Sequence, residues 1–580
     1  MYDAMQKVTD EFTLYGQTYK KKEKDPETGE EIEVDVPVQT GSIVIENNTG
    51  KILSFVGGRD HELEQLNHFN HATQAYRSNG STMKPLLAYA PALEYGVIGA
   101  GSPVVDVKFV REYDDYKPVN YNPNQELGII PAREALASSQ NLAVLRLYNS
   151  ILDRRPATYL EKMGFSKLTE GDYVHLSTAI GGLTYGATVE ENVNAYATFA
   201  NKGKFIDAYM IERIEDLDGN IIYEHQVEPV DVFSEETAYM MTDMLRDVLQ
   251  QGGTATRAQS LLKFSSDFAA KTGTTQDHND VWLVGYNPNI SVGVWLGYDQ
   301  PRTLFAFNNR YQHPSYRVNT LWANYLNTLY DINPELIGTK ETFKQPENVV
   351  TESFCGISGM APSPSCAEAG LVISDLFNRK VLLPTQPDDS FVSSTSVVIN
   401  GTTYAALPTT PTEFVEMQGY GLNQTFIDRM MGTLGGDASK LLPFSSDKGV
   451  VSGIPFVPDN VAPTSVQASL ANGLLTWNAS TSNDIVGYRV YNISNGGSSL
   501  VKSLKSYENY QMNVAPGGNY VVVAVDITGL ESAYSNEVSE IIEAPPPPVE
   551  NEEPEETDDV IDEILDDIII DIEPTEPAEE

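Results

Sequence analysis

Residues 268–297 constrain the fold most, because they are predicted to form three successive β-strands. Apolar and β-branched residues dominate 268–275, 280–286 and 290–297, and the turn Asn287-Pro-Asn separates the last two runs. Strands that follow one another through short connections pair in antiparallel fashion. Two more apolar runs in residues 42–57 flank a turn at Asn47-Asn-Thr-Gly50, which predicts a hairpin. The sequence therefore predicts an antiparallel sheet.

Helical patterns lie between these predicted strands. Alanine and leucine recur at helical spacing in residues 131–147, with an interruption at 138–141. Residues 188–200 and 235–251 continue the helical pattern, while residues 211–223 are predicted to form two short strands around Asp218-Gly-Asn. Helices combined with an antiparallel sheet indicate a mixed α/β class.

A serine and a lysine stand at the start of one further helix. Gly80 permits a tight turn, Pro85 falls in the first helical turn, and the apolar run 86–93 follows. Ser81 and Lys84 are three residues apart and share one helical face, so an amine lies within reach of a hydroxyl. This is the minimum apparatus for activating a serine without histidine. The pattern is weak alone, since it recurs at Ser260/Lys263, Ser445/Lys448 and Ser499/Lys502.

Two more motifs follow in a fixed order, Ser139-x-Asn141 and Lys271-Thr272-Gly273. Together the three motifs resemble those of the penicillin-binding serine transpeptidases. The resemblance covers about residues 40–330 and is greatest to the bifunctional class A group. Its flanking matches are 69–72, 80–85, 135–141, 195–201, 271–275 and 280–282.

The resemblance implies a transpeptidase fold, in which an antiparallel sheet is flanked by helices and accompanied by an all-helical subdomain. It also implies that Ser81 attacks a D-Ala-D-Ala bond and becomes an acyl-enzyme. Lys84 is expected to be the base, with its pKa lowered by burial and by the second cation Lys271. Ser139 is expected to relay a proton to the leaving amine, and Asn141 to bind the substrate amide.

The third motif is expected to bind substrate along its strand. The resemblance assigns this role to Thr272, Gly273, Thr274 and Thr275, and it places the oxyanion hole at the N–H groups of Ser81 and Thr274. We expect no cofactor and no metal, because the seven histidines form no zinc-binding pattern. Gln140 stands where class A β-lactamases have Asp, and no glutamate is evident for water activation, so rapid penicillin hydrolysis is disfavoured.

Charge and hydropathy limit which partners the chain can bind and indicate where it is located. The chain has 38 Lys+Arg against 81 Asp+Glu, a net charge of -43, which excludes nucleic acid as a partner. No apolar run reaches the roughly 18 residues of a membrane span. Class A relatives carry a membrane anchor and a glycosyltransferase domain ahead of this region, so we expect a C-terminal fragment of an extracytoplasmic, cell-wall-side protein.

The remainder of the chain divides by composition. We expect a linker or pedestal segment over 1–40, whose charged stretch is an exposed hairpin or linker, a transpeptidase domain over 41–330 and an irregular extension over 331–455. Residues 456–543 resemble a fibronectin type III module. The resemblance rests on Trp477 as the core aromatic, a tyrosine at the start of a late strand, and the motif Asp526-x-x-Gly529. Residues 544–580 contain no Lys or Arg and are predicted to be a disordered Pro-rich, acidic tail. An amphipathic partner helix over 560–572 is the alternative there.

The only two cysteines, Cys355 and Cys366, have a spacing that suits a small disulfide loop worth about 3 kcal/mol. Two buried free thiols are the alternative.

The predicted function is a DD-transpeptidase that cross-links peptidoglycan stem peptides on lipid-linked precursor or nascent glycan and is acylated by β-lactams. A DD-carboxypeptidase or β-lactamase on the same fold is one alternative. A non-catalytic wall-binding scaffold is the other. Wall polymer and the proteins of the division or elongation machinery are the further partners to consider.

Overall fold

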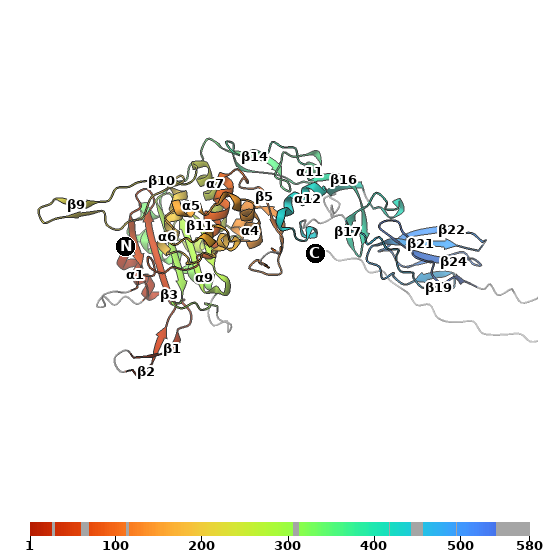
Figure 1. Cartoon of the computed structure of the whole chain (residues 1–580), viewed down its shortest axis with the longest axis horizontal. Coiled ribbons are helices and arrows are strands. Elements are labelled where there is room, and N and C mark those ends of the chain that lie inside the picture. Colours follow the sequence, from red (N-terminus) through yellow and green to blue (C-terminus); the bar gives the residue numbers. More distant parts are fainter. Residues whose placement is uncertain are drawn as a thin grey trace, which may run out of the picture.

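The structure is a computed structural model that describes residues 1–25, 29–59, 69–111, 115–305, 313–416, 418–441, 456–494 and 496–540. Figure 1 shows an elongated chain with an α/β body at one end and a β-sandwich at the other. The extension formed by residues 349–441 lies between them. In the segments described, no helix combines the length and apolar character needed to cross a membrane.

A five-stranded antiparallel sheet forms the centre of the body, as predicted. Its order is β11-β12-β13-β3-β4, with bounds β11 Ala269–Thr274, β12 Asp280–Tyr286, β13 Ile290–Gly297, β3 Gln39–Glu46 and β4 Ile52–Val56. Lys271 pairs with Val284, and Val292 pairs with Val44. The strand with the Lys-Thr-Gly motif, β11, therefore lies at one edge of this sheet.

Helices cover both faces of the sheet. A Cβ on Gly293 would lie 2.1 Å from Val193 of α6 (Val189–Ala200), and one on Gly285 would lie 2.7 Å from Trp322 of α9 (Pro314–Ile332). Val284 pairs with Gly293, so Gly285 points to the opposite face. Because both glycines lack side chains, the two helices approach the sheet closely.

The first helix, α1 (Tyr2–Glu11), lies within residues 1–40, where the sequence predicted a linker or pedestal segment and no helix. Met5 and Phe12 are buried in the core, and Thr9 is hydrogen-bonded to Tyr325 of α9 at 2.7 Å. Only β1 (Tyr19–Lys24) and β2 (Glu31–Val36) form the exposed hairpin that the charges predicted. The helix was missed because its ten residues include five charged or amide side chains.

A helical layer packs beside the sheet and carries the first two motifs. It contains η1 (Gly80–Thr82), η2 (Pro85–Tyr89), α2 (Ala90–Glu94), α3 (Ala132–Ala137), α4 (Asn141–Asn149), α5 (Thr158–Lys162), α7 (Glu235–Arg246) and α8 (Thr256–Leu261). The interruption predicted at 138–141 is the break between α3 and α4. Three short strand pairs complete the body: β5 (Pro103–Asp106)/β6 (Gly128–Pro131), β7 (Lys204–Phe205)/β10 (Val230–Asp231) and the exposed hairpin β8 (Arg213–Glu215)/β9 (Ile221–Glu224).

The extension after α10 (Pro334–Ile337) is ordered, so the prediction of an irregular segment over 331–455 is wrong for its described part. It contains β14 (Val349–Cys355), α11 (Pro364–Glu368), β15 (Val372–Asn378), β16 (Phe391–Ile399), β17 (Thr402–Ala405), β18 (Gln418–Leu422) and α12 (Gln424–Met431). Among the described strands β14 pairs only with β15, and its buried residues Val349, Phe354 and Cys355 stand at its two ends, so it lacks the apolar alternation that identifies a half-buried strand. Residues 442–455 lie outside the described residues.

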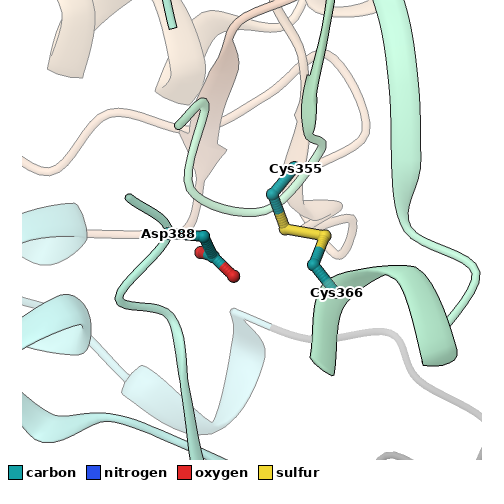
Figure 2. A group of neighbouring side chains, drawn as sticks. All are labelled: Cys355, Cys366 and Asp388. Atoms are coloured by element: carbon teal, nitrogen blue, oxygen red, sulfur yellow. A yellow bond between two sulfur atoms is a disulfide. The ribbon is translucent and has the colours of Figure 1, made fainter. Parts of the chain in front are cut away.

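The two cysteines are joined by a disulfide, which is one of the two alternatives that the sequence left open (Figure 2). Asp388 lies beside the sulfurs, and a group of two cysteines and a carboxylate has the composition of a metal site. The sulfurs are bonded to each other, however, and the Asp388 carboxylate accepts hydrogen bonds from Ser363 and Ser390. These atoms are already used, so we assign the group a structural role.

The C-terminal unit is a sandwich of two antiparallel sheets. One has the order β19-β20-β23 and the other β22-β21-β24-β25, with bounds β19 Ala468–Ala471, β20 Leu474–Trp477, β21 Ile485–Asn492, β22 Ser499–Lys505, β23 Gln511–Asn513, β24 Asn519–Asp526 and β25 Val538–Ser539. Trp477, Tyr488 and Tyr520 lie in its core. The two-sheet arrangement agrees with the sequence, while the resemblance to fibronectin type III stays a prediction. The predicted tail lies outside the described residues.

The sandwich packs against the extension through a second apolar cluster. Val397 and Ile399 of β16 join Phe414, and they contact the outer face of the four-stranded sheet at Val486, Val523, Val525 and Ile527. Arg489 adds ion pairs to Glu413 and Glu531. Extension and sandwich therefore share a core.

Candidate active site

Ser81 lies on a turn held against the edge strand β11. Gly80 has φ +53°, and a Cβ there would lie 2.8 Å from the carbonyl oxygen of Thr274. A Cβ on Gly273 would lie 2.5 Å from the carbonyl oxygen of Asn79. Because both contacts exclude any larger residue, the glycines let the serine motif and the Lys-Thr-Gly motif lie backbone to backbone.

Side chains around Ser81 fix this turn. The Trp282 indole donates to the carbonyl of Ser78 at 2.9 Å, and the Ser78 hydroxyl donates to the carbonyl of Gly181 at 2.7 Å. Arg77 pairs with Asp280 at 2.7 Å. The predicted helix after Ser81 is irregular, passing from the 3₁₀ turn η1 through the π-helix η2 to α2.

Lys84 is completely buried and points to the second motif. Its ammonium donates to the carbonyls of Ser139 (2.6 Å) and Gln140 (3.2 Å) and to Asn141 Oδ1 (2.7 Å). The Ser139 hydroxyl lies 3.3 Å away. Burial lowers the pKa of Lys84 well below its ordinary value, the charge of Lys271 lowers it further, and Asp106 opposes the shift. The pKa of Lys84 is thus shifted in the predicted direction, while its role as the base stays a prediction.

Lys271 approaches the same serine from β11. Its ammonium donates to the Ser139 hydroxyl at 2.8 Å and to the carbonyl of Thr272 at 3.0 Å. Burial lowers the pKa of Lys271 to about 7. Ser139 has φ +61°, an uncommon backbone conformation for a residue with a side chain. The hydroxyl thus lies between two buried amines, which is the arrangement expected of a proton relay.

Asn141 begins α4, and a second asparagine holds it in place. Asn120 Oδ1 accepts from the backbone N–H groups of Asn141 (2.8 Å) and Leu142 (3.1 Å). The Asn141 side-chain amide donates to the carbonyl of Val119 at 2.9 Å. Since an amide nitrogen carries two N–H groups, one remains for a substrate.

A buried carboxylate lies behind Asn120. Asp106, at the end of β5, is fully buried and accepts from Asn120 Nδ2 at 2.9 and 3.0 Å. Burial raises the pKa of Asp106, and the hydrogen bonds from Asn120 and backbone amides oppose that rise. A chain of contacts therefore runs from Asp106 through Asn120 and Asn141 to Lys84.

Sequence reasoning missed both Asp106 and Asn120. The only available signal was one acid ending the apolar run 103–105, and many exposed turns give that signal too. Their pairing across 14 residues depends on the chain path.

The threonines of the third motif differ in their contacts. The Thr272 hydroxyl is hydrogen-bonded to Thr254 at 2.6 Å, and the Thr275 hydroxyl accepts from the backbone of Asp280 at 2.9 Å. Thr274 is partly exposed. Thr275 therefore stabilises the turn after β11, whereas Thr274 is open to a ligand.

The fold and this site correspond to a known class of domain. Residues 40–306 match the family model described as the penicillin binding protein transpeptidase domain. Over these residues the chain is similar to that domain.

Two curated relatives extend the comparison. Penicillin-binding protein 4 of Bacillus subtilis is 32% identical over 294 residues, which are 50% of this chain and 44% of that protein. Penicillin-binding protein 1A of Pseudomonas aeruginosa is 32% identical over 390 residues, 57% of this chain and 44% of that protein. The chain thus spans less than half the length of either relative.

A solved structure agrees in fold. The crystal structure of penicillin-binding protein 1A from Haemophilus influenzae superposes with a TM-score of 0.51 at 23% identity. It covers 63% of this chain and 57% of that one.

Proposed function

We propose that the chain is a serine DD-transpeptidase that cross-links peptidoglycan stem peptides and is acylated by β-lactams. The observation that carries this proposal is the Ser139 hydroxyl held between Lys84 and Lys271, both fully buried, beside the turn that presents Ser81. Buried amines with lowered pKa values accept protons at neutral pH, as a serine nucleophile requires.

The first half-reaction transfers the stem peptide to the enzyme. Ser81 Oγ attacks the carbonyl of the penultimate D-Ala, and its proton passes to Lys84. The oxyanion is held by the N–H groups of Ser81 and Thr274, each worth about 3 kcal/mol. The C–N bond then breaks, and the proton reaches the leaving D-Ala amine through Ser139.

Substrate lies along β11 in this proposal. The edge strand offers backbone groups for an extended peptide, the free N–H of Asn141 binds the donor amide, and Thr274 binds the terminal carboxylate. Because Gly273 has no side chain, the peptide can approach the backbone of the strand closely. Thr272 contributes through its backbone, since its hydroxyl is engaged with Thr254.

The second half-reaction decides between transpeptidase and hydrolase. An amine of a neighbouring stem peptide attacks the Ser81 ester, Ser81 Oγ leaves and recovers a proton, and a cross-link forms. Attack by water would release the peptide instead, as in a carboxypeptidase or β-lactamase. We infer an extracytoplasmic location, because the substrate is there and because disulfides persist in oxidising compartments.

Covalent labelling by fluorescent penicillin tests the acylation step. We expect one label per chain, removed in Ser81→Ala. A label that survives this substitution, or no label on the folded wild type, would contradict the catalytic proposal and favour the non-catalytic scaffold. Incubation with purified stem peptides then tests the acceptor, because cross-linked dimers support a transpeptidase and released D-Ala alone supports a carboxypeptidase.

We assign the sandwich a binding role towards wall polymer or a partner protein. Its support is the shared core with the extension, which would hold it at a set distance from the catalytic domain. Wall sedimentation of the full chain against a chain ending at residue 441 tests the role, and equal sedimentation would contradict it.

A further inference from the structure

The sandwich buries carboxylate oxygens that accept no hydrogen bond from any described residue. Asp484, just before β21, is 3% exposed, and neither of its carboxylate oxygens has a hydrogen-bond partner in the described segments. Asp526, at the end of β24, is fully buried. Its Oδ1 accepts from Thr528 and Leu530, whereas its Oδ2 has no partner among the described residues.

The two aspartates lie at the same end of the four-stranded sheet. Ile485 pairs with Asp526, and the N–H of Ile527 donates to the carbonyl of Asp484 at 3.0 Å. A third carboxylate, Asp459, belongs to the segment that enters the sandwich, and its Oδ1 accepts from the N–H of Val461 at 2.8 Å. Burial raises the pKa of Asp484, and the negative charges of Asp459 and Asp526 raise it further. The backbone pairing therefore places Asp484 and Asp526 at neighbouring strand ends, and Asp459 lies close enough for its charge to act on Asp484.

A buried carboxylate without a donor is unstable as an anion. Either a proton or a cation must compensate it. No Lys or Arg in the described segments forms an ion pair with Asp459, Asp484 or Asp526. Asn400 approaches from the extension, but it donates to the carbonyl of Asn483 and leaves the carboxylates untouched.

We propose that Asp459, Asp484 and Asp526 form a divalent-cation site suited to Ca²⁺, where the entering segment, the sandwich and the extension meet. All available ligands are oxygens, which Ca²⁺ prefers, and exposed Asp459 leaves room for water in its coordination shell. The three carboxylates do not all lie within 4.8 Å of one another. Binding therefore draws the exposed Asp459 side chain inward over the two buried ones.

The position of the site gives the cation a mechanical role. The Thr410 hydroxyl of the extension donates to the carbonyl of Ile527 at 2.7 Å, next to Asp526. A cation bound to Asp459 would tie the entering segment to the same strand ends. The site would therefore stiffen the junction between extension and sandwich. This inference is independent of the proposed catalytic function.

The test is calorimetric titration of the full chain, after removal of divalent ions, with CaCl₂ alone and with MgCl₂ alone. We expect one saturable Ca²⁺ site with a Kd of about 10⁻⁵ to 10⁻³ M, weaker Mg²⁺ binding and a Ca²⁺-dependent rise in Tm. Asp484→Asn should abolish this site, and Asp459→Asn should weaken it at least about tenfold. Asp428→Asn, on the exposed face of α12, is the matched control, because it removes one carboxylate away from the proposed site. The acidic tail is present in every variant, so any Ca²⁺ that it binds does not differ between them.

Equal Ca²⁺ binding by wild type and Asp484→Asn would overturn the proposal. So would a wild type whose Tm ignores Ca²⁺ and rises on acidification below neutral pH, because a proton would then be the compensating charge. If Asp484→Asn fails to fold, Asp459→Asn in the exposed segment still decides the question. Wild-type binding retained by Asp459→Asn would count against the site.

Discussion

The active site and the sandwich both bury charged groups, but they compensate them differently. In the active site every buried ammonium has protein acceptors, four within 3.3 Å of Lys84 and two within 3.0 Å of Lys271. In the sandwich, Asp484 is nearly as deeply buried and meets no donor in the described chain. The difference teaches that the protein itself sets the protonation of its lysines, whereas the aspartates need a proton or a cation from solution.

The largest expected effect tests whether this site performs the chemistry. Ser81→Ala should lower the rate of acylation by penicillin by at least about 10⁴-fold, because the variant lacks the attacking oxygen. Intact-protein mass measures the adduct. Ser499→Ala is the matched control, since Ser499 and Lys502 repeat the spacing on the exposed strand β22. Acylation of the Ser81→Ala variant at the wild-type rate would refute the assignment.

The next effect tests whether burial lowers the pKa of the lysines enough for Lys84 to act as a base. Lys84→Ala should slow acylation by about 10²- to 10⁴-fold at neutral pH. In the wild type the rate should fall as pH drops, because a base with a lowered pKa works above that pKa and is protonated below it. The pKa of Lys271 is about 7, so Lys271 should gain its proton as pH falls through 7.

Stopped-flow acylation from about pH 5 to about pH 10 measures this profile. A rate that increases about tenfold per pH unit across that whole range would mean that Lys84 keeps its ordinary pKa. Lys263→Ala, which alters the exposed Ser260/Lys263 repeat, should leave the profile unchanged.

A smaller effect would sharpen the role of Asp106. Replacing it with Asn keeps an acceptor for Asn120 but removes the negative charge that favours protonated Lys84. The acidic limb of the acylation profile should therefore move to lower pH by about one unit. Glu126→Gln is the control, because Glu126 contacts Lys108 on the same loop but does not contact Asn120 or Lys84. If both variants keep the wild-type limb, Asp106 is purely structural.

The smallest effect on catalysis concerns the extension. The double substitution Cys355→Ser, Cys366→Ser should destabilise the extension by about 3 kcal/mol through restored chain entropy. Acylation should change less than about twofold, because the bridge lies outside the three motifs. Thermal unfolding followed alongside penicillin labelling separates the two readouts. A parallel loss of labelling would show that the extension supports the catalytic helices.

The elements that the sequence predicts differ from those that it misses in how local their signal is. The strands of the central sheet and the sandwich were predicted because alternation within one strand reports its own burial. The motifs Ser81, Lys84, Ser139 and Lys271 were found because a known spacing carries them. The fold of the extension and helix α1 were missed, since their buried side chains pack on partners far away in the sequence, as Thr9 does on Tyr325.

The sequence by itself determined the α/β sheet, the two-sheet sandwich, the three motifs and the acidic character, because each is written in local pattern or composition. Only the tertiary structure decided which polar groups meet. It set Asp106 behind Asn120, tied Thr272 to Thr254, and left Asp484 and Asp526 buried at one sheet end. The physical reason is that burial removes water as a partner, so the charge of a group depends on neighbours that only the folded chain supplies.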